Sequence, residues 1–237
     1  MTTRTALIVR GGWEGHQPVK ATEVFLPFLE RNGFGIRIEE SPEIYADADA
    51  MAATDLIVQS MTMSQITPDQ VRGLRAAVEA GTGLAGWHGG IADSYRASSD
   101  YLQLVGGQFA THPSKSPELL VEGAPENNYL HYTVEITGPG RQHPITAGIE
   151  DFELTTEQYW VLHDDLNDVL ATTTHPTQPW HPWHRPVTSP AVWTRLWGRG
   201  RIVVATPRHT PEVLEHPSVR TIIERGMLWA TRTASES

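Results

Sequence analysis

The sequence contains no cysteine. This absence excludes disulfides, iron–sulfur clusters, thiolate zinc sites and cysteine nucleophiles. A metal site would have to use histidine, carboxylates, carbonyl groups or water. Lysine is almost as scarce, because Lys20 and Lys115 are the only lysines among 18 basic residues. Neither lysine stands in a motif that indicates Schiff-base chemistry.

Long apolar runs are also missing from the chain. No stretch approaches the run of about 20 apolar residues that spans a bilayer, and the polar N-terminus lacks the pattern of a signal peptide. The net charge of −10 argues against nucleic-acid binding, because phosphates must be neutralised by Lys and Arg. We therefore expect a cytoplasmic protein that binds neither membranes nor nucleic acids.

The first half of the chain alternates between buried strands and amphipathic helices. Strands are predicted at residues 5–10, 35–39, 55–59 and 83–87. One helix is predicted to begin near Pro18, with Pro27 kinking or shortening it, and another spans about 68–80. This alternation predicts an α/β fold with a parallel sheet and right-handed crossovers.

The second half of the chain is less regular. The predicted strands lie near 118–122, 131–136, 167–173, 190–196 and 201–206, and a last helix follows at about 217–231. Because no internal repeat or linker is visible, we expect a single domain over residues 1–237. Its core would span about 4–231, with residues 233–237 as a disordered tail.

Gly86-Trp87-His88-Gly89-Gly90 is the most informative segment. In a nucleophile elbow, small residues flank one reactive residue on a strained strand-to-helix turn. Here the pattern is G-x-H-x-G, with His88 where serine or cysteine would stand. A glycine-rich turn whose imidazole merely bonds to a backbone carbonyl accounts for the spacing equally well.

Other histidines follow predicted strands, where loops at the carboxyl ends of a parallel sheet line a ligand crevice. His16 ends the first strand-to-helix turn, His209 follows Arg208 after a buried strand, and His112 can return to the same edge. The alternatives are a solvated loop for His16 and a turn-forming His-Pro pair for His112. Glu157 can orient an imidazole, act as a base or bind metal, or else satisfy a helix start.

Trp180 and Trp183 lie in a stiff, proline-rich loop at residues 179–186. Indole rings offer flat apolar faces with a polar N–H at the edge, which match the faces and hydroxyl edges of a sugar ring. The loop is therefore interpreted as a lid or wall over a carbohydrate, or as an oligomer contact. Exposed tryptophans also favour a homo-oligomer.

In combination, these motifs resemble the trehalose-utilisation (ThuA-like) family over about residues 4–231. The resemblance implies a flavodoxin-like, mostly parallel sheet with helices on both faces, as in the class I glutamine amidotransferase-like superfamily, with His88 replacing the cysteine nucleophile. It also implies a role in sugar catabolism on disaccharides or their keto derivatives. The motifs that carry it are the 86–90 segment, Gly198-Arg199-Gly200-Arg201 with Arg208-His209, residues 143–149 followed by Glu157-Gln158-Tyr159, and residues 216–230.

The resemblance places His16, His88, His112, Glu157 and His209 at the pocket motifs of the family, and the chemistry of these side chains suggests their roles. His88 would be a general base or metal ligand, with Glu157 orienting it or sharing its proton, and with His209 as a further catalytic group. His16, His88 and His209 would ligate a divalent metal such as Zn²⁺ if one is bound. The residues expected to contact the sugar are His16, Trp13, Trp87, His112, Trp180, Trp183 and Arg208.

Two functions remain open from the sequence. The first is an enzyme that acts on a sugar or keto-sugar, either by histidine and glutamate acid–base chemistry or by hydrolysis with a metal-activated water. Glutamine amide transfer is disfavoured because the thiol is missing. The second is a non-catalytic sugar-binding or regulatory protein, in which the same residues hold a carbohydrate without turnover.

Overall fold

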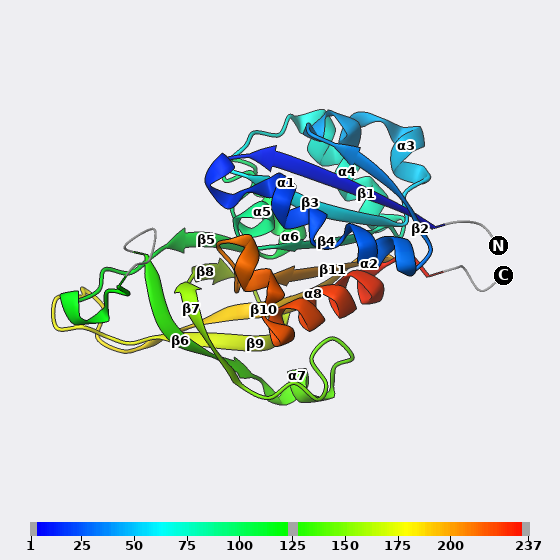
Figure 1. The fold of residues 1–237 in the computed structure, drawn as a ribbon. Helices are drawn as coiled ribbons and strands as arrows, with labels where there is room; N and C mark the ends of the chain where they lie inside the picture. Colours follow the sequence, from blue (N-terminus) through cyan, green and yellow to red (C-terminus); the bar gives the residue numbers. More distant parts are fainter. Residues whose placement is uncertain (1–3, 123–127, 234–237) are drawn as a thin grey trace.

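The computed structural model describes residues 4–122 and 128–233, so the predicted tail lies outside the described residues apart from Thr233. Within these residues a mixed sheet of nine strands runs through the molecule in the order β2-β1-β3-β4-β11-β10-β9-β6-β7 (Figure 1). The strands from β2 to β11 are parallel to one another, whereas the following pairs are antiparallel. The fold is therefore a mixed α/β fold, flanked by helices.

The parallel half corresponds to the strands predicted from the first half of the sequence, together with the strand predicted at 201–206. Apolar residues fill these strands because both faces of the sheet are covered. Their bounds are β1 (Arg4–Gly12), β2 (Phe34–Glu39), β3 (Leu56–Thr62), β4 (Gly83–Trp87) and β11 (Gly200–Ala205).

The antiparallel half contains three predicted strands and one that the sequence did not indicate. β6 (Tyr129–Ile136), β9 (Asp168–His175) and β10 (Val187–Trp197) were predicted, whereas β7 (Phe152–Glu157) was not. β5 (Gly107–Thr111) and β8 (Trp160–His163) form a separate two-stranded sheet and were also missed. All three missed strands are short, and distant pairing rather than local apolar pattern defines them.

The strand predicted at 118–122 is wrong. Residues Pro117–Leu119 form a 3-10 turn, in which the backbone N–H of Leu119 bonds to the carbonyl of Ser116. Pro117 fixes φ and lacks an N–H donor, so it favours the first position of a helical turn over a ladder. The apolar pair Leu119-Leu120 resembles a strand only in composition.

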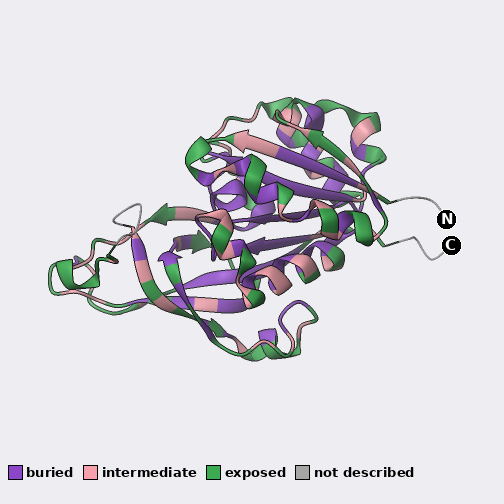
Figure 2. Ribbon diagram, in the orientation of Figure 1, coloured by how far each residue is buried: buried purple, intermediate pink, exposed green. Residues whose placement is uncertain are grey.

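Helices cover both faces of the parallel strands (Figure 2). Alternate strand residues serve two separate cores, so that Ala6 and Ile8 pack on one face while Leu7 and Val9 pack on the other. The first core contacts α1 (Pro18–Glu23), α2 (Leu26–Arg31) and α8 (Pro217–Ala230). The second contacts α3 (Ala48–Ala52), α4 (Pro68–Glu79) and α6 (Ser99–Val105).

Pro27 divides the first predicted helix, as the sequence indicated. α1 ends at Glu23 and α2 begins at Leu26, because Pro27 lacks the N–H that would bond to the carbonyl of Glu23. Two short helices, α5 (Gly89–Ala92) and α7 (Gly138–Gln142), complete the assignment. In the described part of the chain, no helix is long and apolar enough to cross a membrane.

Candidate metal centre

His88 occupies a strained turn between β4 and α5. Its φ of 50° and ψ of −141° lie in a region that residues with a side chain rarely adopt. The turn requires glycine at the neighbouring positions, because a side chain there would clash with the surrounding backbone. A Cβ at Gly86 would lie 2.7 Å from the carbonyl oxygen of Gln59, and one at Gly90 would lie 2.8 Å from the Cα of Ser60. The sharp strand-to-helix turn expected at 86–90 is present.

Both ring nitrogens of His88 have close neighbours. Nδ1 lies 2.9 Å from the carbonyl oxygen of Thr206, and Nε2 lies 3.0 Å from Oε2 of Glu157. The ring stacks on Tyr159, with centroids 4.1 Å apart. Because a carbonyl can only accept a hydrogen bond, Nδ1 must carry the proton of the neutral imidazole. Nε2 of neutral His88 therefore presents a lone pair to the carboxylate.

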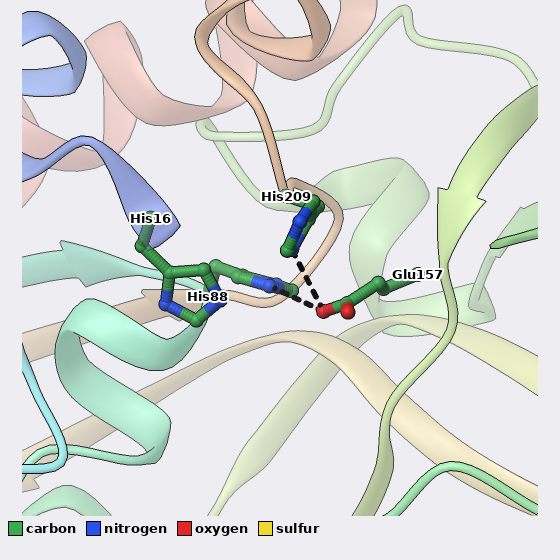
Figure 3. A group of neighbouring side chains, drawn as sticks. All are labelled: His16, His88, Glu157 and His209. Carbon is green, nitrogen blue, oxygen red and sulfur yellow. Dashed lines mark hydrogen bonds and ion pairs between the residues drawn. The ribbon is translucent and has the colours of Figure 1, made fainter. Parts of the chain in front are cut away.

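Glu157, the last residue of β7, is the centre on which the imidazoles converge (Figure 3). Its Oε2 lies 3.0 Å from His88 Nε2, 3.0 Å from His209 Nδ1 and 3.5 Å from His112 Nε2. Burial by itself would raise the pKa of Glu157, but its close contacts with the imidazoles of His112, His209 and His88 outweigh burial and hold this pKa well below its usual range. Glu157 is therefore a carboxylate at neutral pH.

His16 and His209 complete the cluster from two further loops at the carboxyl edge of the sheet. Nδ1 of His16 lies 3.0 Å from Oγ1 of Thr62, and its ring lies 4.6 Å from that of His88 and 5.1 Å from that of His209. Candidate ligand atoms of His16, His88, Glu157 and His209 all lie within 4.8 Å of one another, and all four residues are buried.

Burial keeps two of these imidazoles uncharged. It lowers the pKa of His88 to about 4, although the nearby carboxylate of Glu157 acts in the opposite direction. It also lowers the pKa of His16 to about 2, reinforced by His88, Arg208 and His209. At pH 7 the contact between His88 and Glu157 therefore has no proton to share. The lone pairs of His88 Nε2 and Glu157 Oε2 lie 3.0 Å apart in a buried site and repel each other, so the binding of a cation there is favoured.

The donor set fits a divalent metal ion. Imidazole nitrogens and one carboxylate oxygen suit Zn²⁺ and similar ions, and such ligands must be deprotonated. The lowered pKa values of His16, His88 and Glu157 meet this requirement. The two separations of 3.0 Å around Oε2 are close to the roughly 3.3 Å expected between ligands of a tetrahedral Zn²⁺ ion with bonds of about 2.0–2.1 Å. The carbonyl bond from Nδ1 of His88 is the support that metal-ligating histidines usually receive.

The other expected pocket residues surround this cluster to different degrees. His112 is part-exposed; its Nδ1 bonds to the carbonyl oxygen of Gln158 while Nε2 points to Glu157. Trp13 is 40% exposed and packs edge-on against His16. Arg208 is buried and donates to the carbonyl of His16; burial lowers its pKa to about 10. Of these three residues, Trp13 and His112 have exposed surface, whereas Arg208 has none.

The three other expected sugar contacts have different surroundings. The prediction that Trp87 contacts the sugar is corrected, because this side chain has no exposed surface and packs against Phe25 in the core. Successive strand residues face opposite sides, so the step from Trp87 to His88 leads from the core to the cluster. Trp180 bonds to Ser114, and Trp183 stacks on His181, which is outside the cluster.

Sequence reasoning missed two aromatic residues at the cluster. Tyr159 stacks on His88, and Tyr129 packs edge-on against His209. Tyr159 belongs to the Glu157-Gln158-Tyr159 segment, which carried part of the family resemblance, and its position two residues after Glu157 was the available signal. No sequence signal indicated Tyr129, because its place at the cluster depends on the pairing of β6 with β7.

The metal-free protein should lose stability as pH falls from about 6.5 towards 4. A histidine whose pKa is lowered by folding binds protons more readily in the unfolded chain, so its contribution is complete above pH 6.5 and is lost below it. For His88 the loss is up to about 1.4 kcal/mol per pH unit in this window. Urea unfolding of protein that has been freed of metal by a chelator, at pH 7, 6 and 5, measures this loss of stability.

The variant His88→Asn isolates this contribution, since asparagine tolerates positive φ better than most residues. We expect its free energy of unfolding to fall less steeply with pH than that of the unaltered protein, by about 1 kcal/mol per pH unit. Equal slopes for the two proteins would show that His88 is not a buried neutral imidazole.

Comparisons with known proteins show the family and the fold of the chain. The model of a family described as trehalose utilisation (ThuA) matches residues 5–230. A ThuA-like protein from Bacteroides uniformis has a similar structure, with a TM-score of 0.71 and 17% identity over 96% of this chain and 91% of that one. One from Parabacteroides merdae has a TM-score of 0.69 and 14% identity, over 98% and 92%.

A protein from Salmonella typhimurium described as cytoplasmic is also similar, with a TM-score of 0.59 and 14% identity over 96% of this chain and all of that one. At these identities the structural likeness shows the fold alone. No curated protein matches the chain in sequence.

Proposed function

The chain belongs to the trehalose-utilisation (ThuA) family, and from this premise we propose that it is an enzyme of carbohydrate catabolism with a divalent metal ion. The ligands would be His16, His88, Glu157 and His209. The substrate would be a disaccharide or its keto derivative. The order β2-β1-β3-β4-β11 of the parallel strands supports a flavodoxin-like core for it.

One observation carries the proposal. Nδ1 of His88 is committed to the carbonyl oxygen of Thr206, so its bare Nε2 faces the carboxylate of Glu157 at 3.0 Å in a buried site. A divalent cation held by His88 and Glu157 would remove the repulsion, whereas a proton is disfavoured because burial holds the pKa of His88 near 4. The same argument disfavours His88 as a general base, because so weak a base accepts protons poorly at neutral pH.

The chemistry then divides between the metal and the protein. A Zn²⁺ or similar ion would supply Lewis acidity to a carbonyl or hydroxyl oxygen of the sugar, provided that it accepts this oxygen as a further ligand. Glu157 and the imidazoles would hold the ion, and the ring of Tyr159 supports His88. His112 is the best candidate for moving a proton, because it is part-exposed and its Nε2 lies 3.5 Å from Glu157. Trp13 would contact the substrate at the outer side of the cluster, and Arg208 would hold the backbone of His16 in place.

Metal analysis and turnover of a keto-disaccharide test this proposal together. We expect the purified protein to hold about one divalent ion per chain and to lose turnover on chelation, with recovery when the ion is restored. His88→Ala should lose both the ion and the turnover. Sugar binding without turnover under any divalent metal would favour the non-catalytic alternative, and failure to retain any ion would contradict the metal site.

Location and assembly remain proposals beside this one. We propose a cytoplasmic protein, in keeping with the description of the similar Salmonella protein. We also propose a homo-oligomer, which the exposed side chains of Leu162, Leu166 and Leu196 support.

A further inference from the structure

A cavity of about 460 Å³ lies beside the candidate metal centre. Its walls are the segment 113–119, the middle of β6 and the segment 174–181, which starts at the end of β9. In Figure 1 the two loop segments extend side by side at the left of the sheet. The volume lies within the range of about 300–1,000 Å³ that small-molecule pockets occupy.

The cavity adjoins Glu157 through two connections. Pro113 and Gln158, which line the cavity, are the chain neighbours of His112 and Glu157, the two residues whose side chains meet at 3.5 Å. On β6, His131 and Thr133 also line the cavity. The pairing of β6 with β7 sets Tyr129 opposite Glu157 and His131 opposite Thr155, so the carboxylate lies on the same face as His131.

The tryptophan-rich loop supports one wall of this cavity. Nε1 of Trp180 donates to Oγ of Ser114 at 3.1 Å, and Nε2 of His181 lies 2.6 Å from the carbonyl oxygen of Ser114. Trp183 stacks on His181, with ring centroids 4.1 Å apart. The two indoles therefore hold the wall in place, while His181, Ser114 and Gln178 line it.

The lining combines apolar side chains with neutral hydrogen-bonding groups. Leu119 and Leu130 offer apolar surface, while Thr133 and Gln158 offer polar groups. Among the lining residues that the structure describes, Lys115 has the one ammonium group, which donates to the carbonyl of Tyr129, and Glu135 contributes a carboxylate. These described residues do not form the cluster of Lys and Arg side chains that a phosphate requires, and they suit the apolar faces and hydroxyl edges of a neutral sugar ring.

We propose that this cavity is the subsite for the second sugar ring of a disaccharide, with the glycosidic linkage directed towards His112 and Glu157. The inference rests on the proposed function, because it names which part of the substrate the chain would recognise outside the metal centre. It makes Leu130 and Thr133 specificity-determining residues for two-ring over one-ring sugars.

Methyl NMR of the full-length protein tests the subsite directly. The protein is titrated with trehalose, maltose and sucrose, and with glucose as the one-ring reference. Saturable shifts are expected at the methyl groups of Leu119 and Leu130 with at least one disaccharide, and not at those of Leu166 and Leu196, which are exposed elsewhere. The absence of such shifts with all three disaccharides would overturn the proposal.

A cavity-filling variant provides the second readout. Leu130→Trp should weaken disaccharide binding by at least about tenfold and leave glucose binding unchanged, whereas Leu196→Trp on β10 should change neither. Thr133→Trp, at an exposed position of β6, serves if Leu130→Trp does not fold. Disaccharide binding of normal strength in a folded variant would contradict the subsite.

Metal content separates this proposal from the proposed function. Leu130→Trp leaves the four candidate ligands untouched, so its metal content should equal that of the unaltered protein. Methyl shifts in a protein that holds no metal would leave the subsite standing and refute the metal-dependent activity. A metal-loaded, active protein whose cavity methyl groups show no shifts with disaccharides would refute the subsite alone.

Discussion

Replacement of Glu157 by glutamine should weaken metal binding and turnover by at least about a hundredfold. The carboxylate is the only anionic member of the four-residue cluster, and imidazole nitrogens of His88 and His209 lie 3.0 Å from its Oε2. Glutamine has nearly the same shape but no charge, so the variant isolates electrostatics from packing. Competition with a chelating dye measures the metal affinity, and keto-disaccharide turnover measures the activity.

Glu153→Gln is the matched control for this variant. Glu153 lies on the same strand and pairs with His131 at 3.3 Å, but its side chain is exposed. Removal of its charge should leave metal affinity and turnover within about twofold of normal, since exposed ion pairs contribute little. Equal behaviour of the two variants would show that Glu157 has no special role.

Gly89→Ala should disable the cluster without altering any candidate ligand. A Cβ at Gly89 would lie 2.5 Å from Cε1 and 2.7 Å from Nδ1 of His16, closer than side-chain carbons approach. The imidazole must therefore move away from His88. We expect a loss of metal affinity of about tenfold or more, and a decrease of about 1–3 kcal/mol in the free energy of unfolding.

Gly138→Ala makes the same chemical change where there is space. Nothing lies within 4 Å of a Cβ at Gly138, and its φ is not positive. Both metal affinity and stability should remain close to those of the unaltered protein. If Gly89→Ala also retained full metal affinity, the position of His16 would be irrelevant to the ion.

The parallel half of the fold could be predicted from the sequence because local patterns of neighbouring residues define its strands and helices. Strands such as β1 and β3 are buried on both faces and appear as continuous apolar runs, and Thr67 and Pro68 mark the start of α4. The carboxyl ends of β1, β4 and β11 also predicted that His16, His88 and His209 would meet. The structure brings these three imidazoles together.

The remaining parts of the site depend on contacts between distant segments. Glu157 gave the local pattern of a helix start, yet it ends β7, whose existence depends on pairing with β6. Trp87 was expected to contact sugar because it precedes His88, but alternation in β4 turns it into the core. The neutral state of His88 follows from burial, and its tautomer follows from the carbonyl of Thr206, 118 residues away in the chain.

X-ray absorption spectroscopy of the zinc-loaded protein is the most direct test of the metal centre. The account predicts three imidazole ligands and one carboxylate oxygen from the protein, and no retained zinc in His88→Ala. A spectrum with fewer than two imidazoles, or one that is unchanged in His88→Ala, would contradict the claim that this cluster binds the ion.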